Sequence, residues 1–170
     1  MNVATTAIHA HCTAQTAIDT PLGVLRLGRT AAGLAGAWFE GQKHHPGPLA
    51  ALERPSDPML RAAALQIAGY FAGRAVRFDV PLDLHGTAFQ RAVWQALLAI
   101  ERGQTRRYAD IAGAVGSASA LRAVGAAIGR NPLSIVVPCH RVIGSDGTLT
   151  GYAGGLARKR ALLALEGVAA

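Results

Sequence analysis

The chain has 170 residues, carries a formal net charge of +7 at pH 7 and is 51% apolar, so it can bury a core as one ordinary domain or two small ones. No apolar run is long enough for a membrane span, and the start from Met1 to Cys12 predicts no secretory signal. The two cysteines, Cys12 and Cys139, are too few for a disulfide-rich secreted scaffold and favour a cytoplasmic protein with Cys139 free.

The positive charge is spread unevenly along the chain. Residues 1–83 carry seven Lys or Arg and six Asp or Glu, whereas residues 84–170 carry ten and four. A cationic half is what a phosphate-binding surface needs, because each contact releases counterions condensed on nucleic acid. A basic surface kept only for solubility is the alternative, and charge alone does not separate the two.

The first half of the chain predicts strands followed by a helix. Asp57-Pro58 opens the helix, because Asp can cap it and Pro suits the first turn. Leu60, Ala64, Ile67 and Phe71 then recur on one apolar face. Residues 41–57 predict a loop. Four short stretches are expected to be strands: 14–18, 23–27, 33–39 and 76–80.

The pattern changes to helices near residues 84–86, and this change predicts two domains, 1–83 and 84–170. Thr87 with Gln90 forms a capping box, and the helix that follows is expected to end at Gly103. Two shorter helices, at 108–115 and 121–128, are joined by small residues. Such a pair in the basic half indicates a helix-turn-helix, although many helical domains contain similar pairs.

The last part of the chain predicts a strand, a hairpin and a helix. Residues 134–137 form a short apolar strand that leads into the Pro138–Val142 motif. Asp146-Gly147 predicts a tight hairpin between 142–143 and 149–150, which would serve as a wing after the helix-turn-helix. The final helix is expected over 156–166.

Cys139 is the strongest candidate for a reactive residue. It is flanked by His140 and Arg141, which both cost desolvation energy inside a core. A cysteine attacks as the thiolate, and nearby cationic or imidazole groups make the thiolate easier to form. A buried structural cysteine is the alternative. Because neighbouring residues on a strand point to opposite faces, His140 can aid Cys139 only if the chain bends at the motif.

The stretch Pro138–Val142 resembles the acceptor motif of the O6-alkylguanine-DNA alkyltransferases, or methylated-DNA–protein-cysteine methyltransferases. The first 80 residues resemble this family more loosely, through the turn at 20–23 and the helix at 57–73. The resemblance implies an α+β fold, with a small N-terminal β-sheet and helix domain and a C-terminal helical, winged helix-turn-helix domain. Further parts of the second domain resemble the family: 86–94, 122–127, 131–132 and 147–167.

The resemblance also implies catalytic roles for five residues: Cys139, His140, Glu166, Asn131 and, through protonation of the leaving guanine, Tyr108. Cys139 would be the nucleophile and the final alkyl acceptor. His140 would take its proton through a water oriented by Glu166, so that a base next to the nucleophile is fixed by a carboxylate. Asn131 would tie the turn before the acceptor strand and hold Cys139 in place.

Recognition of DNA is implied for a second group of residues. Tyr108 would press on the DNA backbone, help to rotate the nucleotide out of the stack and assist protonation of the leaving guanine. Arg122 would fill the gap left in the stack, on a recognition helix that includes Ala123 and Gly125. The base pocket would be lined by Val142, Tyr152 and the backbone of Ala153.

The activity that the resemblance implies is direct reversal of DNA damage. One alkyl group would pass irreversibly from O6-alkylguanine, and more weakly from O4-alkylthymine, in double-stranded DNA to Cys139. We expect a monomer with no cofactor, because the cysteine is itself the acceptor. We also expect no metal, since Cys12, His11 and His85 do not complete the zinc site of some relatives. A non-catalytic binder of alkylated DNA, a transcription regulator and a cysteine hydrolase are the alternatives.

Overall fold

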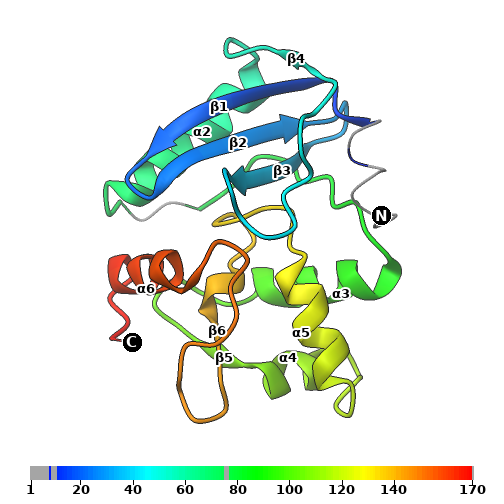
Figure 1. Ribbon diagram of the computed structural model, residues 1–170, viewed down its shortest axis with the longest axis vertical. Coiled ribbons are helices and arrows are strands. Elements are labelled where there is room, and N and C mark those ends of the chain that lie inside the picture. Colours follow the sequence, from blue (N-terminus) through cyan, green and yellow to red (C-terminus); the bar gives the residue numbers. More distant parts are fainter. Residues whose placement is uncertain (1–7, 9–10, 75–76, 170) are drawn as a thin grey trace. The chain divides into compact units, whose positions relative to one another are not determined.

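The structure is a computed structural model that describes residues 8, 11–74 and 77–169 (Figure 1). Its contacts divide the chain into two compact units. The first unit holds the described residues up to His85 together with Pro132–Val136, and the second holds Gly86–Asn131 and the chain from Val137 onwards. A small sheet with a helix forms the first unit and helices dominate the second, so the predicted α+β fold is confirmed.

A four-stranded sheet forms the first unit, in the order β3-β2-β1-β4. The first three strands are antiparallel, and the short β4 pairs parallel with β1. Thr20 lies opposite Gly23, so a tight turn joins the first two strands, which each run two residues beyond the expected end. The strand bounds are β1 (Ala14–Thr20), β2 (Gly23–Arg29), β3 (Leu34–Phe39) and β4 (Leu52–Glu53).

Helix α2 (Pro58–Phe71) covers one face of this sheet (Figure 1). It begins as predicted, because Asp57 Oδ1 accepts hydrogen bonds from the backbone N–H groups of Met59 and Leu60 at 3.0 and 3.1 Å. The other carboxylate oxygen of Asp57 accepts from Arg29 Nη2 at 2.5 Å, which ties the helix start to the end of β2. The predicted apolar face is buried at Leu60 and Ile67.

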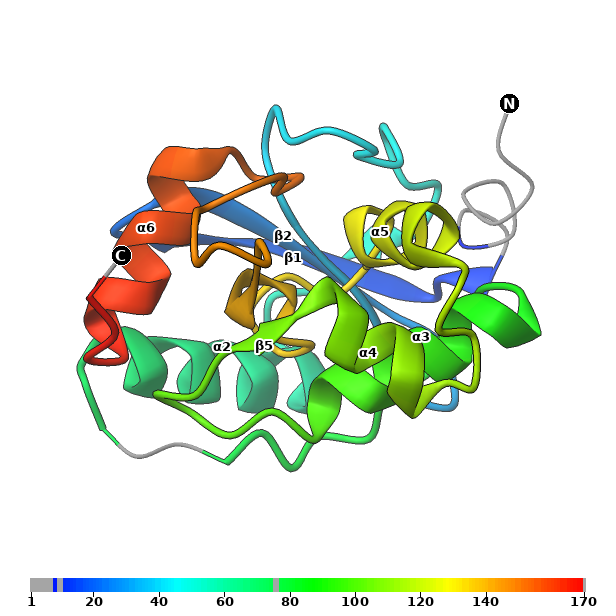
Figure 2. The ribbon, with the colours of Figure 1, turned by 90° about the horizontal axis from the view of Figure 1, so that it is seen from below.

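Four helices form most of the second unit. Their bounds are α3 (Ala88–Leu98), α4 (Tyr108–Ala114), α5 (Leu121–Gly129) and α6 (Leu156–Leu165). The capping box of Thr87 and Gln90 begins α3 as predicted. The indole N–H of Trp94 in α3 donates to the carbonyl of Ala127 in α5 at 2.9 Å. Helices α4 and α5 pack against each other and against α3, which gives the expected helix-turn-helix arrangement (Figure 2).

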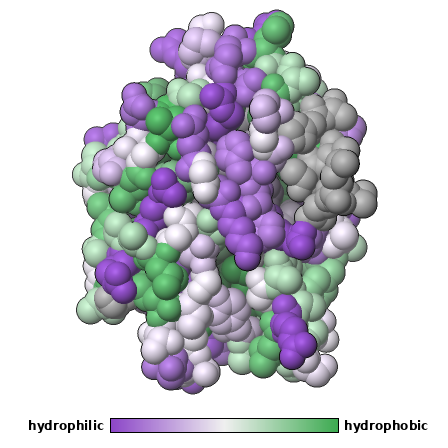
Figure 3. All heavy atoms as spheres, in the orientation of Figure 1, coloured by the Kyte–Doolittle hydropathy of each residue, from purple (hydrophilic) through white to green (hydrophobic). Residues whose placement is uncertain are grey.

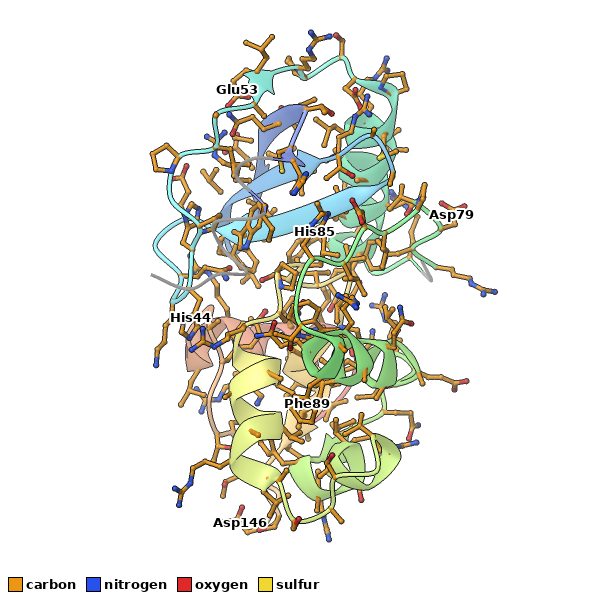
Figure 4. All side chains as sticks on the ribbon, turned by 90° about the vertical axis from the view of Figure 1, so that its right-hand side faces the viewer. His44, Glu53, Asp79, His85, Phe89 and Asp146 are labelled. Atoms are coloured by element: carbon orange, nitrogen blue, oxygen red, sulfur yellow. The ribbon has the colours of Figure 1, made fainter. Side chains whose placement is uncertain are left out.

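The predicted hairpin after the acceptor motif is wrong. Strand β6 (Val142–Ile143) pairs parallel with β5 (Arg106–Arg107), and residues 149–150 form no strand. The intervening loop is closed instead by a bond from Gly144 N to Thr148 O at 2.9 Å and by the carboxylate of Asp146, which is labelled in Figure 4. The Thr150 carbonyl accepts a hydrogen bond from the side chain of Lys159 at 2.8 Å instead of one from a neighbouring strand.

Three other predicted elements also differ from the structure. Helix α3 ends at Leu98 rather than Gly103, which lies in the following loop with φ of +80°. Residues 134–137 form turns and a bend instead of a strand, because Val136 N donates to Ser134 O and so reverses the chain within the segment. Of the strand predicted at 76–80, residue 76 lies outside the described residues and 77–80 form no strand. Leu82 makes only an isolated bridge with Leu34.

The surface carries no large apolar face on the side shown in Figure 3, where hydrophobic residues lie in small groups between hydrophilic ones. Scattered apolar residues of this kind are ordinary for a protein surface. In the described part of the chain, no helix combines the length and apolar character that a membrane crossing requires. The large exposed hydrophobic residues are Leu52, Leu65, Leu98, Leu121 and Leu156.

Candidate active site

The chain bends sharply at Cys139, which lies in a single 3-10 turn, Cys139–Arg141. Pro138 before it has φ of −82° and ψ of 61°, and Cys139 N donates to Val137 O at 2.8 Å. This bend meets the condition under which His140 can lie near the sulfur. The Cys139 side chain is buried, with 5% of the residue exposed.

Asn131 fastens the turn that precedes the cysteine. It lies two residues beyond the end of α5 and is buried. Its amide nitrogen Nδ2 donates to Val137 O at 2.8 Å and to Cys139 Sγ at 3.0 Å. One side chain therefore fixes both the backbone before the cysteine and the sulfur atom itself.

A buried carboxylate organises the two residues that follow the cysteine. Glu166, at the end of α6, has Oε1 2.7 Å from His140 Nε2. Arg141 donates to both oxygens of Glu166, from Nε at 2.8 Å and from Nη2 at 3.0 Å, and its Nη1 donates to Ile100 O at 2.5 Å. Because Glu166 contacts the imidazole directly, this carboxylate fixes the base next to the cysteine, as the resemblance implied.

Burial keeps the cysteine and the histidine neutral. Burial raises the pKa of the Cys139 thiol, and the hydrogen bond from Asn131 and the charge of Lys159 oppose this shift only partly. Burial also lowers the pKa of His140, despite the neighbouring Glu166. The expectation that flanking cations would favour the thiolate is wrong for Arg141, which binds Glu166. A neutral imidazole can accept the thiol proton when the reaction requires it.

Lys159 is a functional candidate that the sequence analysis missed. It is fully buried in α6, and its Nζ donates to three carbonyls, those of Val142 at 2.5 Å, Thr150 at 2.8 Å and Gly151 at 3.3 Å. Burial lowers its pKa to about 8. The signal available in the sequence was the spacing of Lys159 to the apolar Leu162 and Leu163, which places it on the buried face of the helix.

Tyr108 shares a carbonyl with this lysine. The hydroxyl of Tyr108, at the start of α4, donates to Thr150 O at 3.2 Å. Burial raises the pKa of the phenol, so it stays protonated at neutral pH and can donate a hydrogen bond. Lys159 and Tyr108 together hold the loop that runs from β6 to α6.

The proposed pocket residues lie in or next to that loop. Val142 is fully buried, and Tyr152 and Ala153 are half-buried. Gly154 is needed here, because a Cβ at this position would come within 2.6 Å of Tyr152 Cε1. The ring of Tyr152 therefore lies against the glycine backbone, where a side chain would displace it.

Exposed cations lie on the helix-turn-helix side of the second unit. Arg122 and Ala123 are exposed on α5, and Gly125 is half-exposed on the same helix. Arg106 and Arg107 are exposed in β5. Within the described residues, the side chain of Arg122 makes no hydrogen bond or ion pair. Arg122 and Ala123 therefore lie at the surface, whereas Cys139, His140, Glu166 and Asn131 converge in the interior.

The first unit holds His11, Cys12 and His85, the residue types that could bind a metal. The rings of His11 and His85 stack with centroids 5.3 Å apart, and His85 Nε2 lies 2.7 Å from Asp83 Oδ2 (His85 is labelled in Figure 4). Cys12 is buried in a cluster with Trp38, and burial raises its pKa to about 11. Among the described residues, no three His, Cys, Asp or Glu side chains converge as metal ligands.

Family models match both parts of the chain. The DNA binding domain of 6-O-methylguanine DNA methyltransferase matches residues 88–168, and the ribonuclease-like domain of the same protein matches residues 14–84. This chain belongs to the 6-O-methylguanine DNA methyltransferase family. The resemblance expected from the acceptor motif is therefore confirmed, and the family is one of DNA-binding proteins.

Relatives of this family member span nearly its whole length. The methylated-DNA–protein-cysteine methyltransferases of Mycolicibacterium paratuberculosis and Methanosarcina barkeri are 48% and 46% identical to it, over 88% of this chain and 89% and 94% of theirs. The crystal structure of Mycobacterium tuberculosis OGT in complex with DNA superposes with a TM-score of 0.84 at 46% identity, covering 91% of this chain and 92% of that one.

Proposed function

We propose that this chain repairs double-stranded DNA by transferring the alkyl group of O6-alkylguanine to Cys139, irreversibly and once per molecule. Membership of the family gives the class of reaction, transfer of an alkyl group from DNA to a cysteine of the protein. The observation that supports Cys139 as the acceptor is its sulfur, held at 3.0 Å by Asn131 beside the His140–Glu166 pair.

The proton of the thiol goes to His140. Glu166 Oε1 accepts from Nε2–H of the imidazole, so Nδ1 carries the lone pair that takes the proton, in a path that can include a water. The thiolate then attacks the alkyl carbon, the new S–C bond forms, and the bond from carbon to guanine O6 breaks with its electron pair on O6. Arg141 holds the charge of Glu166 while the imidazolium forms.

The departing guanine needs a proton donor. Tyr108 supplies it, because its phenol is kept protonated by burial and is already oriented by Thr150. The product is a neutral thioether on Cys139, which no residue of the site can hydrolyse, so the protein is consumed. No cofactor takes part in this sequence of steps, since the acceptor is a residue of the chain.

The target base must leave the duplex to reach a buried sulfur. Eversion costs a few kcal/mol, and less for a base whose pairing is already damaged, which favours the lesion. Arg122, exposed and without a partner among the described residues, fills the vacated position, and Ala123 and Gly125 present the helix surface to DNA. Val142, Tyr152 and the Ala153 backbone line the pocket for the everted base.

Three finer properties belong to the same proposal. O4-alkylthymine is a weaker substrate, the chain acts as a monomer, and it works in the cytoplasm. The compartment is inferred from the two buried free cysteines, which a reducing environment preserves.

Transfer of a labelled methyl group tests the proposal. Duplex DNA carrying a labelled methyl at guanine O6 is incubated with the protein, and label is followed on both. We expect the label to appear on wild-type protein and on Cys12→Ser, the matched cysteine control, and to stay on DNA with Cys139→Ser. The serine variant should keep its DNA affinity to within about threefold, because phosphate contacts dominate binding.

The alternatives give different outcomes in the same assay. A non-catalytic binder would leave all label on the DNA with the wild-type protein. A transcription regulator would bind one sequence tightly regardless of the lesion, and a cysteine hydrolase would release label into solution with repeated turnover. Label on the Cys139→Ser protein would contradict the assignment of the acceptor.

A further inference from the structure

A short stretch of the second half of the chain belongs to the first unit. The backbone leaves the second unit after Asn131 and returns to it at Val137, so Pro132–Val136 lies with the sheet of the first unit. Cys139 follows this stretch after two residues. The acceptor therefore comes directly after the point at which the chain leaves the first unit.

Backbone bonds fasten this stretch to β3. Ala37 N donates to Pro132 O at 2.8 Å, and Ser134 N donates to Ala37 O at 2.9 Å. Leu133 forms the corresponding parallel bridge with Ala37 and is fully buried. These bonds fix the backbone up to Ser134.

Gln42, three residues after β3, adds a side-chain bond to the same point. Its Oε1 accepts from Phe39 N at 2.7 Å and from Ser134 Oγ at 3.2 Å. Gln42 is 6% exposed and Ser134 is 3% exposed, so water does not compete for this bond. The bond joins the end of β3 to the last anchored residue before a change in chain direction.

The change of direction is a strained turn at Ile135. Ile135 has φ of +73°, and Val136 N donates to Ser134 O at 2.9 Å, which closes a three-residue γ-turn. A γ-turn with positive φ is rare, and β-branched side chains are the least suited to this region. Such strain persists only where the surrounding structure over-determines it. The anchor at Ser134 supplies one side of that constraint.

No regular helix or strand separates this turn from the acceptor. Pro138 makes a second tight turn, closed by Cys139 N and Val137 O. Asn131 holds Val137 O from the other side at 2.8 Å. The position of the sulfur therefore depends on the two anchored points, Ser134 and Val137, between which the backbone is strained.

We propose that Gln42 is a positioning residue for the alkyl-transfer reaction, acting through its hydrogen bond to Ser134 to hold the strained turn that places Cys139. The inference rests on the proposed function, because it concerns the rate of transfer to this cysteine. Gln42 touches neither the substrate nor the sulfur. A residue of the first unit would therefore affect the rate of transfer without taking part in the chemical step.

Single-turnover methyl transfer from duplex DNA tests this role, with the full chain and a lesion at guanine O6. We expect Ser134→Ala and Gln42→Ala each to lower the limiting rate by about tenfold, since small displacements of a reacting group are costly. The duplex concentration that gives half the limiting rate should stay within about twofold of wild type, because phosphate contacts set affinity. Ser134→Thr, which keeps the hydroxyl, should restore the rate.

Two comparisons separate positioning from simple loss of stability. Thr30→Val removes another hydrogen bond of the first unit, the partly buried one from Thr30 Oγ1 to Asp83 Oδ2 at 2.6 Å, without touching Pro132–Val136. It should lower the melting temperature as Gln42→Ala does, yet leave the limiting rate unchanged. The double variant Gln42→Ala with Ser134→Ala should be no slower than the slower single variant, because both substitutions remove the same bond, from Ser134 Oγ to Gln42 Oε1.

The outcomes distinguish this inference from the function on which it rests. If wild-type protein accepts no methyl group, the proposed function fails. If wild-type protein reacts and the Ser134→Ala and Gln42→Ala variants react as fast, only the positioning role is overturned. Equal slowing by Thr30→Val, or multiplicative slowing in the double variant, would also overturn it.

Discussion

The two units use buried polar groups in opposite ways. In the first unit, the hydrogen bond from Arg29 lowers the pKa of Asp57, and bonds from Thr30 and His85 lower that of Asp83 although burial opposes them. Their charges are matched by partners and serve to fasten turns of the chain. A polar group whose charge is well compensated stabilises the fold and has little tendency to exchange protons.

In the second unit, burial shifts the pKa of each key group toward the neutral form. It raises the pKa of Cys139, lowers that of His140 and lowers that of Lys159 to about 8. The ion pair of Glu166 with Arg141 is buried there, and Glu166 also holds the histidine. The reactive groups of the second unit therefore rest in forms that can change protonation during a reaction, while Asp57 and Asp83 of the first unit stay ionised.

The largest effect is expected at Glu166, because this carboxylate both compensates the charge of Arg141 and orients His140. Glu166→Gln removes the carboxylate that orients His140 and leaves Arg141 buried without its counter-charge. Methyl transfer should slow by about 100-fold. The free energy of unfolding, from chemical denaturation, should fall by about 3 kcal/mol.

Glu101→Gln is the matched control, because Glu101 is exposed in the same unit. It should change neither quantity. A Glu166→Gln protein that reacts at the wild-type rate would remove the His140–Glu166 pair from the mechanism.

A smaller effect is expected at Lys159. Lys159→Met removes the donor that holds the carbonyls of Thr150 and Gly151 but keeps most of the buried volume. We expect transfer to slow by about tenfold, because the loop and the charge near Cys139 both change. Arg160→Met, an exposed neighbour on α6, should react at the wild-type rate. Equal rates for both variants in the single-turnover assay would leave Lys159 with a structural role alone.

Breaking an ion pair of the first unit should affect stability only. Asp57→Asn keeps a side chain that can cap α2 and removes the charge that binds Arg29. The free energy of unfolding should fall by about 1 kcal/mol, since Arg29 is partly exposed to solvent. The limiting rate of methyl transfer should not change. A clear loss of rate in this variant would show that the ion pair of the first unit also affects the reaction.

The smallest effect is a difference in pH dependence between the units. Because the pKa of His140 is lowered in the fold, the unfolded chain binds its proton first as the pH falls below about 6.5. Stability should therefore decrease below that pH in wild type and less so in His140→Gln. The contribution of Asp57, whose pKa is lowered, should be lost only below about 4. Thermal unfolding measured from pH 8 to pH 3 follows both losses of stability. If the contributions of His140 and Asp57 were lost over the same pH range, the expected difference between the units would be contradicted.

The sequence predicted features that follow local rules. Asp57 and Thr87 begin their helices as expected, because a cap depends on a few neighbouring residues. The sequence could not show that residues 134–137 turn, since their apolar run is typical of a strand and the positive φ of Ile135 is imposed by tertiary contacts. Gln42 was assigned only to a loop, because its partner Ser134 is 92 residues away.

Long-range partners likewise limited prediction of the site. Cys139 and its neighbours were found from the motif, but the contact of Glu166 with His140 was implied by family resemblance rather than by spacing. The hairpin after β6 was wrong because Lys159 takes the carbonyl of Thr150. Residues that act through distant partners were therefore the ones that sequence patterns missed.

Peptide-mapped mass measurement with excess lesion-bearing duplex tests the central claim most directly. The account predicts that every protein molecule gains the mass of one methyl group, on the peptide that contains Cys139, and that repair stops when all molecules carry it. A protein that removes many methyl groups while keeping its starting mass, or that gains the group on a different residue, would contradict the account.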